Sequence, residues 1–257
     1  MCLIFMGLNA HPRYKLVVAA NRDEFYQRKT APLHQWDDHP EIIGGRDMEA
    51  FGTWMGMNRN GKLSMVTNFR DPANINPVAP SRGKLVTDFL LGQVPAGDYM
   101  NNLAPAGKTY NGFNLIAGTA DELFYFSNYG NGIMQIPAGI HGLSNHLLDT
   151  PWPKVRRGVP KMQALLETEE LATQPFFDLL YDDGIAPDDQ LPDTGVGIER
   201  ERMLSSMFIK TPNYGSRCST VLLIDRQNKV TYAERVFNLT TFDYSEKKLE
   251  FEYPTVY

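Results

Sequence analysis

The 257-residue sequence contains only two cysteines, Cys2 and Cys218. Two thiols in a chain of this length do not make a disulfide framework, so a reducing compartment is expected. The sequence also has no block of consecutive lysines and arginines, and its formal net charge is −5. A chain of this charge pattern is a poor partner for nucleic acid, and we expect no nucleic-acid ligand.

Long apolar runs are missing as well. No uninterrupted stretch approaches the ~20 residues of a membrane-spanning helix, and the start lacks the basic region of a signal peptide. We therefore expect a cytoplasmic protein without a transmembrane segment. The histidine pairs His34/His39 and His141/His146 lie on no helix with a carboxylate at ligand spacing, so we expect no metal site.

Several catalytic and binding motifs are absent too. No glycine-rich phosphate loop follows a strand, and no Gly-x-Ser-x-Gly elbow occurs. The chain is 42% hydrophobic and 11% aromatic, which is enough to bury a substantial core. We expect a single domain over residues 1–257, in which the aspartate-rich stretch 183–198 is an exposed excursion. The sequence leaves the oligomeric state open.

The apolar pattern predicts more strand than helix. Apolar runs predict strands at residues 2–8, 14–20, 52–58, 63–68, 112–118, 122–128, 132–136, 139–145, 219–225, 230–237 and 248–253. Helical periodicity predicts helices at 81–92 (with Ser81 as its cap), 98–103, 154–168 and 173–182. The remaining stretches read as an irregular connection (30–40), a turn (44–47) and a segment that fits either helix or strand (199–208). This order of strands, helices and strands indicates an α+β or layered-sandwich fold and disfavours a Rossmann fold.

The first residues, Met1-Cys2-Leu3-Ile4-Phe5, carry the clearest chemical signal. Cysteine has a small side chain, so we expect an aminopeptidase to remove Met1. Cys2 would then hold both a thiol, with a pKa of about 8.5, and an α-amine, with a pKa of about 7.7–8.0, that accepts its proton. The alternative is a small buried cysteine at the start of a strand.

Polar residues follow several predicted strands and could complete such a site. An N-terminal thiol enzyme needs a cation to favour the thiolate, a carboxylate to orient the amine and amide donors to hold the oxyanion. The candidates are Arg22 and Arg217 as the cation, Asp23 as the carboxylate, and Asn68 and Asn145 as the amides. Each alone could be a solvated strand end, and together they support catalysis at least as well as a structural role. Cys218, beside a strong strand, is interpreted as structural.

A set of short motifs resembles the NRDE family, also called the transport and Golgi organisation protein 2 family. The motifs are Cys2, Asn21-Arg22-Asp23-Glu24, Gly45-Arg46-Asp47, Gly52-Thr53-Trp54, Thr67-Asn68, Ser81-Arg82-Gly83, Leu143-Ser144-Asn145, Pro151-Trp152-Pro153-Lys154 and Arg217-x-Ser219-Thr220. The resemblance runs from Met1 to about Asp225 and leaves out the acidic loop 183–198. It implies a four-layer αββα sandwich of the N-terminal-nucleophile hydrolase type.

More distantly, the pattern is similar to penicillin V acylases and bile salt hydrolases. That resemblance implies catalytic roles for five residues. Cys2 is the nucleophile, Arg22 and the late Arg217 are the arginines, Asp23 is the carboxylate and Asn145 is the oxyanion amide, with Asn68 as a second oxyanion candidate. Asn21-Arg22-Asp23-Glu24 is packed more tightly than the acylases' arginine-x-x-aspartate. Whether Asp23 or Glu24 orients the amine is therefore open.

Two functional hypotheses follow. The first is a cofactor-independent amidohydrolase that cleaves the non-peptide C–N bond of a small, linear acyl amide. The second is a non-catalytic carrier of an amphipathic ligand, haem or an acyl-CoA or lipid, both of which have been proposed for the family. Under the second hypothesis an apolar cleft would be lined by the aromatics of 51–69 and by Met6, Met48, Met55, Met57 and Met65, for which core packing is the alternative use.

Overall fold

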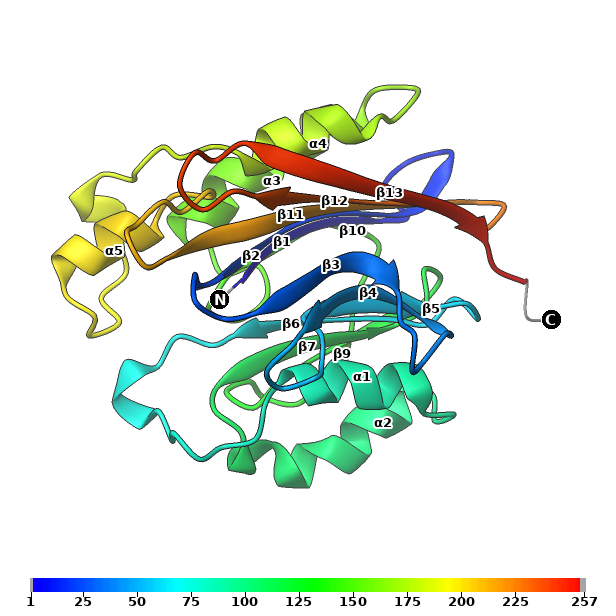
Figure 1. Cartoon of the computed structure of the whole chain (residues 1–257), viewed down its shortest axis with the longest axis horizontal. Coiled ribbons are helices and arrows are strands. Elements are labelled where there is room, and N and C mark those ends of the chain that lie inside the picture. The colour runs from blue at the N-terminus through cyan, green and yellow to red at the C-terminus, as the bar shows by residue number, and fades with distance from the viewer. Residues whose placement is uncertain (1, 255–257) are drawn as a thin grey trace.

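The protein is a sandwich of two antiparallel sheets, with helices on both outer faces (Figure 1). The structure is a computed structural model that describes residues 2–254 and, at Cys2, the main chain only. The layers run helix, sheet, sheet, helix. This is the αββα arrangement that the motifs imply.

The first sheet has six strands. In spatial order these are β10 (Gly139–Leu143), β1 (Cys2–Leu8), β2 (Tyr14–Phe25), β11 (Tyr214–Asp225), β12 (Lys229–Phe237) and β13 (Tyr244–Glu252). The second sheet has seven strands, β3 (Thr30–Gln35), β4 (Ile42–Asp47), β5 (Met55–Asn58), β6 (Leu63–Asn68), β7 (Phe113–Gly118), β8 (Leu123–Ser127) and β9 (Ile133–Gln135).

Each sheet has its own pair of covering helices. The helices α3 (Pro153–Leu166) and α4 (Thr173–Leu180) cover the six-stranded sheet, and α1 (Gly83–Leu91) and α2 (Ala96–Leu103) cover the seven-stranded sheet (Figure 1). A short helix, α5 (Ile198–Leu204), lies at one end of the sandwich, near the start of β11. Three 3₁₀ turns lie in the loops, at Pro72–Asn74, Ala104–Thr109 and Asp188–Gln190.

The core consists of three apolar layers, one between each pair of neighbouring structural layers. Strand β1 shows why. Ile4 and Met6 pack between the sheets, whereas Leu3 and Phe5 pack against the helices. A strand that is buried on both faces needs an unbroken apolar run, and residues 3–6 supply one.

Three sequence-based assignments are wrong at the strand level. β2 does not stop at residue 20 but continues to Phe25, because β11 pairs with its far end. The stretch 30–40, read as irregular, contains strand β3, and the predicted turn 44–47 is part of strand β4. Its glycines had suggested a turn, but they allow close packing: a Cβ at Gly44 would lie 2.8 Å from the Met55 carbonyl oxygen.

The other predicted elements are present, with shifted ends. The ambiguous segment 199–208 begins with α5, and β11 starts at Tyr214 instead of 219. Ser81 does not cap α1, whose first flanking residue is Arg82, without a side-chain cap. None of the helices within residues 2–254 is both long enough and apolar enough to cross a bilayer.

Candidate active site

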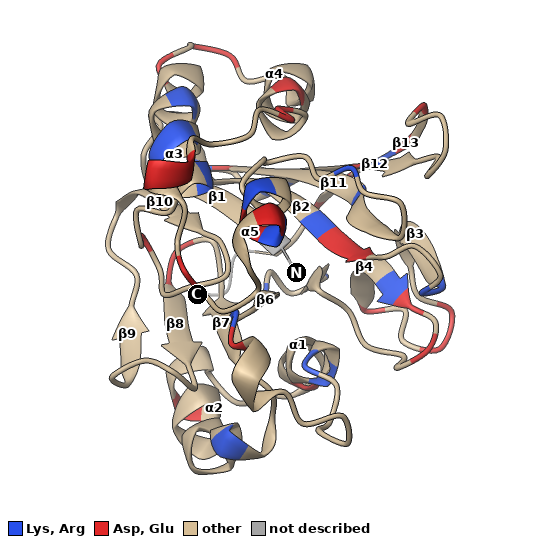
Figure 2. Cartoon of the chain, turned by 90° about the vertical axis from the view of Figure 1, so that its left-hand side faces the viewer, with Lys and Arg blue, Asp and Glu red and all other residues tan. Residues whose placement is uncertain are grey.

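The strand register brings the start of β1 next to the far end of β2. Cys2 is paired with Arg22 in the β1–β2 ladder, and Arg22 is paired with Cys218 in the β2–β11 ladder. The side chain of Cys2 lies outside the described residues, so a contact between its sulfur and an arginine stays a prediction. Figure 2 faces this end of the molecule, where charged residues of β2 and β4 lie side by side.

Arg22 is the central cation of this region. Its side chain is 5% exposed, and its guanidinium carbon lies 4.4 Å from the centre of the Trp54 ring. Nη2 lies 3.8 Å from Asp47 Oδ2 and 3.9 Å from Glu24 Oε2. Nη1 is buried and has no hydrogen-bond partner among the described residues. The guanidinium as a whole is thus paired with carboxylates, while Nη1 keeps a hydrogen-bonding capacity that is costly to leave unused in a buried place.

The position of Trp54 depends on a glycine in β4. A Cβ at Gly45 would lie 2.3 Å from the Trp54 ring, so only glycine leaves room for the indole. Arg22 then lies over that ring, where an arginine gains cation–π stabilisation. The motifs Gly45-Arg46-Asp47 and Gly52-Thr53-Trp54 therefore both help to hold one arginine, through Trp54 and Asp47.

Asp23 lies on the opposite face of β2, toward the helices. It is fully buried, and its Oδ1 accepts a hydrogen bond of 2.6 Å from Ser216 Oγ. Lys154 Nζ, in the first turn of α3, lies 3.7 Å from Asp23 Oδ2 and is itself 2% exposed. Burial raises the pKa of Asp23, and the positive charge of Lys154 acts in the opposite direction.

Glu24, the other candidate for orienting the amine, lies on the same face as Arg22. Its Oε1 accepts a hydrogen bond of 2.8 Å from the Phe25 main-chain N–H. Burial alone would raise the pKa of Glu24, but that hydrogen bond and the charges of Arg22 and Arg28 hold it below its usual range. Asp23 and Glu24 therefore differ sharply in environment, although they are neighbours in the sequence.

The two candidate oxyanion amides, Asn68 and Asn145, are linked to each other. Asn145 Nδ2 donates to the Asn68 main-chain oxygen at 3.0 Å, which ties the segment after β10 to the end of β6. Asn145 is fully buried, and its Oδ1 has no hydrogen-bond partner among the described residues. Asn68, in contrast, lines a cleft.

Arg217, the second predicted cation, lies at a bulge where the β2–β11 register shifts between Ser216 and Cys218. Its Nη1 donates to three main-chain carbonyl oxygens, those of Phe25 at the end of β2 and of Tyr26 and Arg28 just after it. Burial and the nearby charge of Arg22 lower the pKa of Arg217. In the structure this guanidinium fixes a turn.

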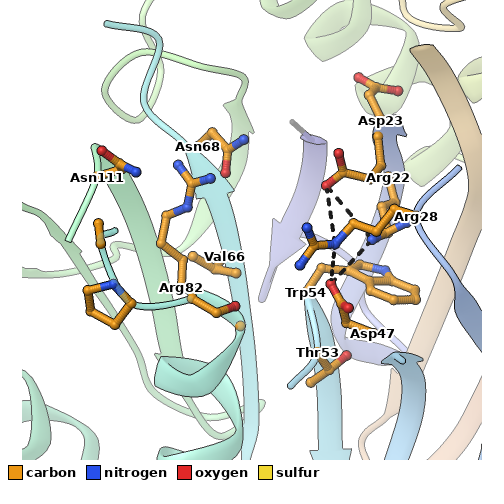
Figure 3. Close-up of a pocket in the computed structure, with 15 residues that line it drawn as sticks. Arg22, Asp23, Arg28, Asp47, Thr53, Trp54, Val66, Asn68, Arg82 and Asn111 are labelled. Carbon is orange, nitrogen blue, oxygen red and sulfur yellow. Dashed lines mark hydrogen bonds and ion pairs between the residues drawn. The ribbon is translucent and has the colours of Figure 1, made fainter. Parts of the chain in front are cut away.

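The cleft beside Arg22 has a volume of about 270 Å³. Its lining residues are Arg22, Asp23, Glu24, Arg28, Asp47, Thr53, Trp54, Val66, Asn68, Ala79, Pro80, Ser81, Arg82, Gly83 and Asn111. One wall holds an ion-pair group in which Arg28 Nε lies 2.6 Å from Asp47 Oδ2, and Arg82 and Asn68 lie across from it (Figure 3).

The acidic excursion 183–198 and α5 dock on the same end of the molecule through a buried ion pair. Arg70 Nη1 lies 2.7 Å from Glu201 Oε2, and both side chains are at most 5% exposed. Glu201 Oε1 also accepts the main-chain N–H of Thr194 at 2.9 Å, and Arg70 lies over the Trp152 ring. The excursion is therefore partly fixed, not wholly exposed.

Sequence reasoning missed five residues of this region. Trp54, Asp47, Arg82 and Lys154 stand in motifs that carried the family resemblance but received no role, and Arg28 had no signal at all. The lysine could have been noticed because it is a charged residue on the buried side of α3.

The methionines proposed to line an apolar cleft lie in the core or on the surface instead. Met6, Met55, Met57 and Met65 are at most 3% exposed and pack between the sheets, and Met48 is on the surface. No group of three or more His, Cys, Asp or Glu side chains within the part of the chain that the structure describes could hold a metal ion.

Comparison with solved structures identifies the fold. The Caenorhabditis elegans N-acylethanolamine-hydrolyzing acid amidase ortholog aligns with 86% of this chain and 92% of its own, with a TM-score of 0.51 and 10% identity. A C2A mutant of the conjugated bile acid hydrolase from Clostridium perfringens aligns with 99% and 97% of the two chains, at a TM-score of 0.48 and 7% identity. The chain has the αββα fold of the N-terminal-nucleophile hydrolases.

Sequence comparison gives the family. The model of the Transport and Golgi organisation 2 family matches residues 1–239, and the chain belongs to this family. It is 37% identical to both the Bos taurus and Homo sapiens Transport and Golgi organization protein 2 homologs, each over 91% of this chain and 92% of theirs. The Drosophila melanogaster Transport and Golgi organization protein 2 is 28% identical, over 91% of each chain. The match includes residues 183–198, which the expected resemblance had left out.

Proposed function

We propose that the protein is a cysteine amidohydrolase that cleaves the C–N bond of a small acyl amide. The observation that carries the proposal is the pairing of Cys2 with a buried arginine at the edge of a cleft, on an N-terminal-nucleophile hydrolase fold. An adjacent cation favours a thiolate. Trp54 and Asp47 hold that cation in place on the other side.

The reaction requires Met1 to be removed, which leaves Cys2 with a free α-amine. The amine takes the thiol proton, and the sulfur attacks the carbonyl carbon of the amide. The C–N bond then breaks, the leaving amine takes the proton, and an acyl thioester remains on Cys2. Water hydrolyses this thioester, which releases the carboxylic acid and restores the thiol.

In this proposal Asp23 orients the α-amine. Its carboxylate is fully buried next to the start of β1, and a buried carboxylate is stabilised by a nearby positive charge. Asn68 lines the cleft and supplies an amide donor to the oxyanion, while Asn145 positions Asn68 through the hydrogen bond to its main-chain oxygen.

The polar lining of the cleft also supports hydrolysis over the carriage of an apolar ligand. Three arginines and two asparagines line it, and the core methionines do not. Cleavage of an amide needs such charged and amide groups near the carbonyl.

Mass spectrometry of the intact protein tests the proposal directly. We expect the mass of the chain without Met1 and, after mixing with a reactive p-nitrophenyl ester, the added mass of one acyl group on Cys2. Because the chain has two cysteines, Cys218→Ser is the matched control and keeps the acylation, whereas Cys2→Ser loses the thioester. Retention of Met1, or acylation that does not depend on Cys2, would falsify the proposal.

A further inference from the structure

The cleft has a second feature that hydrolysis alone does not require. The residues Ser81, Arg82 and Gly83, at the N-terminus of α1, line the cleft. Arg82 lies across the cleft from the Arg22 ion-pair group (Figure 3). This helix has nine residues, no acidic side chain in its first turn and no side-chain cap. The amide N–H groups of Lys84 and Leu85 already donate to the Ser81 and Arg82 carbonyl oxygens, at 3.2 and 3.1 Å. This helix end therefore attracts an anion through its dipole.

Close packing fixes this helix end in the wall. A Cβ at Gly83 would lie 3.1 Å from the Thr53 carbonyl oxygen, and a Cβ at Gly52 would lie 2.5 Å from the main chain of Gly83. The glycines therefore let the loop before β5 cross directly over the start of α1. Arg82 Nη1 donates to the Gly112 carbonyl oxygen at 3.0 Å, which holds the guanidinium beside the cleft.

The opposite wall supplies an independent sign of a ligand. Arg22 lines the same cleft, is 95% buried, and its Nη1 lacks a hydrogen-bond partner among the described residues. The other charges of that wall are occupied with one another, since Arg28 and Arg22 both lie within 4.0 Å of Asp47 and Glu24. The cleft thus has two ends. One, at Arg22, lies beside the proposed nucleophile, and the other, at Arg82, has an arginine without a neighbouring role in the proposed reaction.

We propose that the substrate carries an anionic group, a carboxylate or a phosphate, which binds to Arg82 and the N-terminus of α1 while the amide carbonyl faces Arg22. This inference rests on the proposed function, because it takes the molecule in the cleft to be the substrate. Arginine binds both carboxylates and phosphates through two parallel hydrogen bonds. The geometry therefore selects a negative charge, and the experiment below decides between carboxylate and phosphate.

Binding to a Cys2→Ala protein tests this inference, because this variant lacks the proposed nucleophile and cannot hydrolyse the ligand. Isothermal titration would use three matched ligands: N-butanoylglycine, N-butanoyl-O-phosphoethanolamine and the neutral N-butanoylglycinamide. We expect at least one of the two anions to bind about tenfold more tightly than the neutral amide. The stronger of the two identifies the carboxylate or the phosphate.

Arg82→Gln should reduce that preference to about threefold or less. The matched control is Lys84→Gln, which also removes one positive charge, two residues further along the chain. The Lys84 side chain is exposed and pairs with Asp88. If Arg82→Gln does not fold, Arg82→Lys keeps the charge but not the paired donors and should weaken both anions while retaining the preference.

Three results would overturn the inference. They are equal binding of the neutral ligand, no binding of either anion, and an equal loss of preference in the Lys84→Gln control. Hydrolysis is measured separately, with the native Cys2 protein and the same three amides. Loss of hydrolysis with the anion preference intact refutes only the proposed function, and hydrolysis without an anion preference refutes only this inference.

Discussion

The guanidinium of Arg22 lies 4.4 Å from the centre of the Trp54 ring, and Gly45 is the residue that leaves space for that ring. The relationship joins three of the sequence motifs, one on β2 and two on or after β4. It also means that a methyl group on β4 can disturb a cation on the other sheet.

We expect Gly45→Ala to destabilise the protein by about 1–3 kcal/mol, because the added Cβ would lie 2.3 Å from the indole and must displace it. Displacement of Trp54 should also move Arg22 and lower the reactivity of Cys2. Urea denaturation and thiol labelling measure the two effects. The control is Gly97→Ala in α2, where the nearest atom lies at an ordinary 3.5 Å and the change should be neutral or stabilising. Similar losses in both variants would contradict this account.

A second prediction concerns the buried pair Arg70–Glu201. Glu201→Gln should lower the free energy of unfolding by about 3–5 kcal/mol, because it leaves a buried arginine without its carboxylate. Replacing both residues with methionine should recover part of the loss. Denaturant unfolding of the two single variants and the double variant gives the coupling energy. Purely additive losses would show that the pair does not hold the excursion in place.

A third prediction concerns Glu234, a carboxyl group buried in β12. Burial raises the pKa of Glu234 to about 7, although the Leu33 main-chain N–H donates to its Oε1 at 2.7 Å. The folded state therefore holds a proton that the unfolded state loses near pH 4.5. The free energy of unfolding should fall by roughly 3 kcal/mol between about pH 4.5 and 7 and then level off.

The Glu234→Gln variant keeps the acceptor oxygen for Leu33 but cannot titrate. Its stability should lack this fall between pH 4.5 and 7, while the contributions of all other groups remain. Thermal or urea unfolding of both proteins across that range makes the comparison. Parallel pH curves for the two proteins would rule out Glu234 as the titrating group.

The α+β order of strands and helices could be predicted from the sequence, because buried strands and their helices leave clear apolar periods. The four-layer αββα arrangement was implied by the family motifs, not by those periods. The strand β4 could not be predicted, since Gly44 and Gly45 normally indicate a turn and only their packing against β5 and Trp54 explains them. Likewise, no sequence pattern shows the bulge from which Arg217 reaches the main chain after β2. The catalytic roles, the single-domain extent 1–257 and the cytoplasmic location stay predictions.

A fourth prediction concerns the thiol of Cys2 itself. Its pKa should lie well below about 8.5 if Arg22 favours the thiolate more strongly than burial disfavours it. Iodoacetamide labelling of the Met1-free Cys218→Ser protein across pH 5–9 measures this pKa. Arg22→Ala should raise it. Labelling that begins only above pH 8 and does not respond to Arg22→Ala would leave Cys2 as a structural residue.

The last prediction separates Asp23 from Glu24 as the group that orients the amine. Asp23 must be ionised to hold the α-amine, so activity should be present above its pKa and lost as the pH falls through it. Burial raises this pKa and Lys154 opposes that rise, so Lys154→Met should move the acid limb of Cys2 acylation to higher pH. Lys161→Met, an exposed lysine of the same helix that pairs with Asp182, is the matched control and should leave the limb in place.

Two further variants complete this test. Asp23→Asn should abolish the acid limb together with most of the acylation, because a neutral amide neither titrates nor attracts the amine. Glu24→Gln should keep the limb, since Glu24 lies on the other face of β2 beside Arg22 and Arg28. Both proteins are compared by the rate of acylation of Cys2 between pH 4 and 8. If the limb disappears with Glu24→Gln and survives Asp23→Asn, then Glu24 orients the amine and the buried Asp23–Lys154 pair is structural.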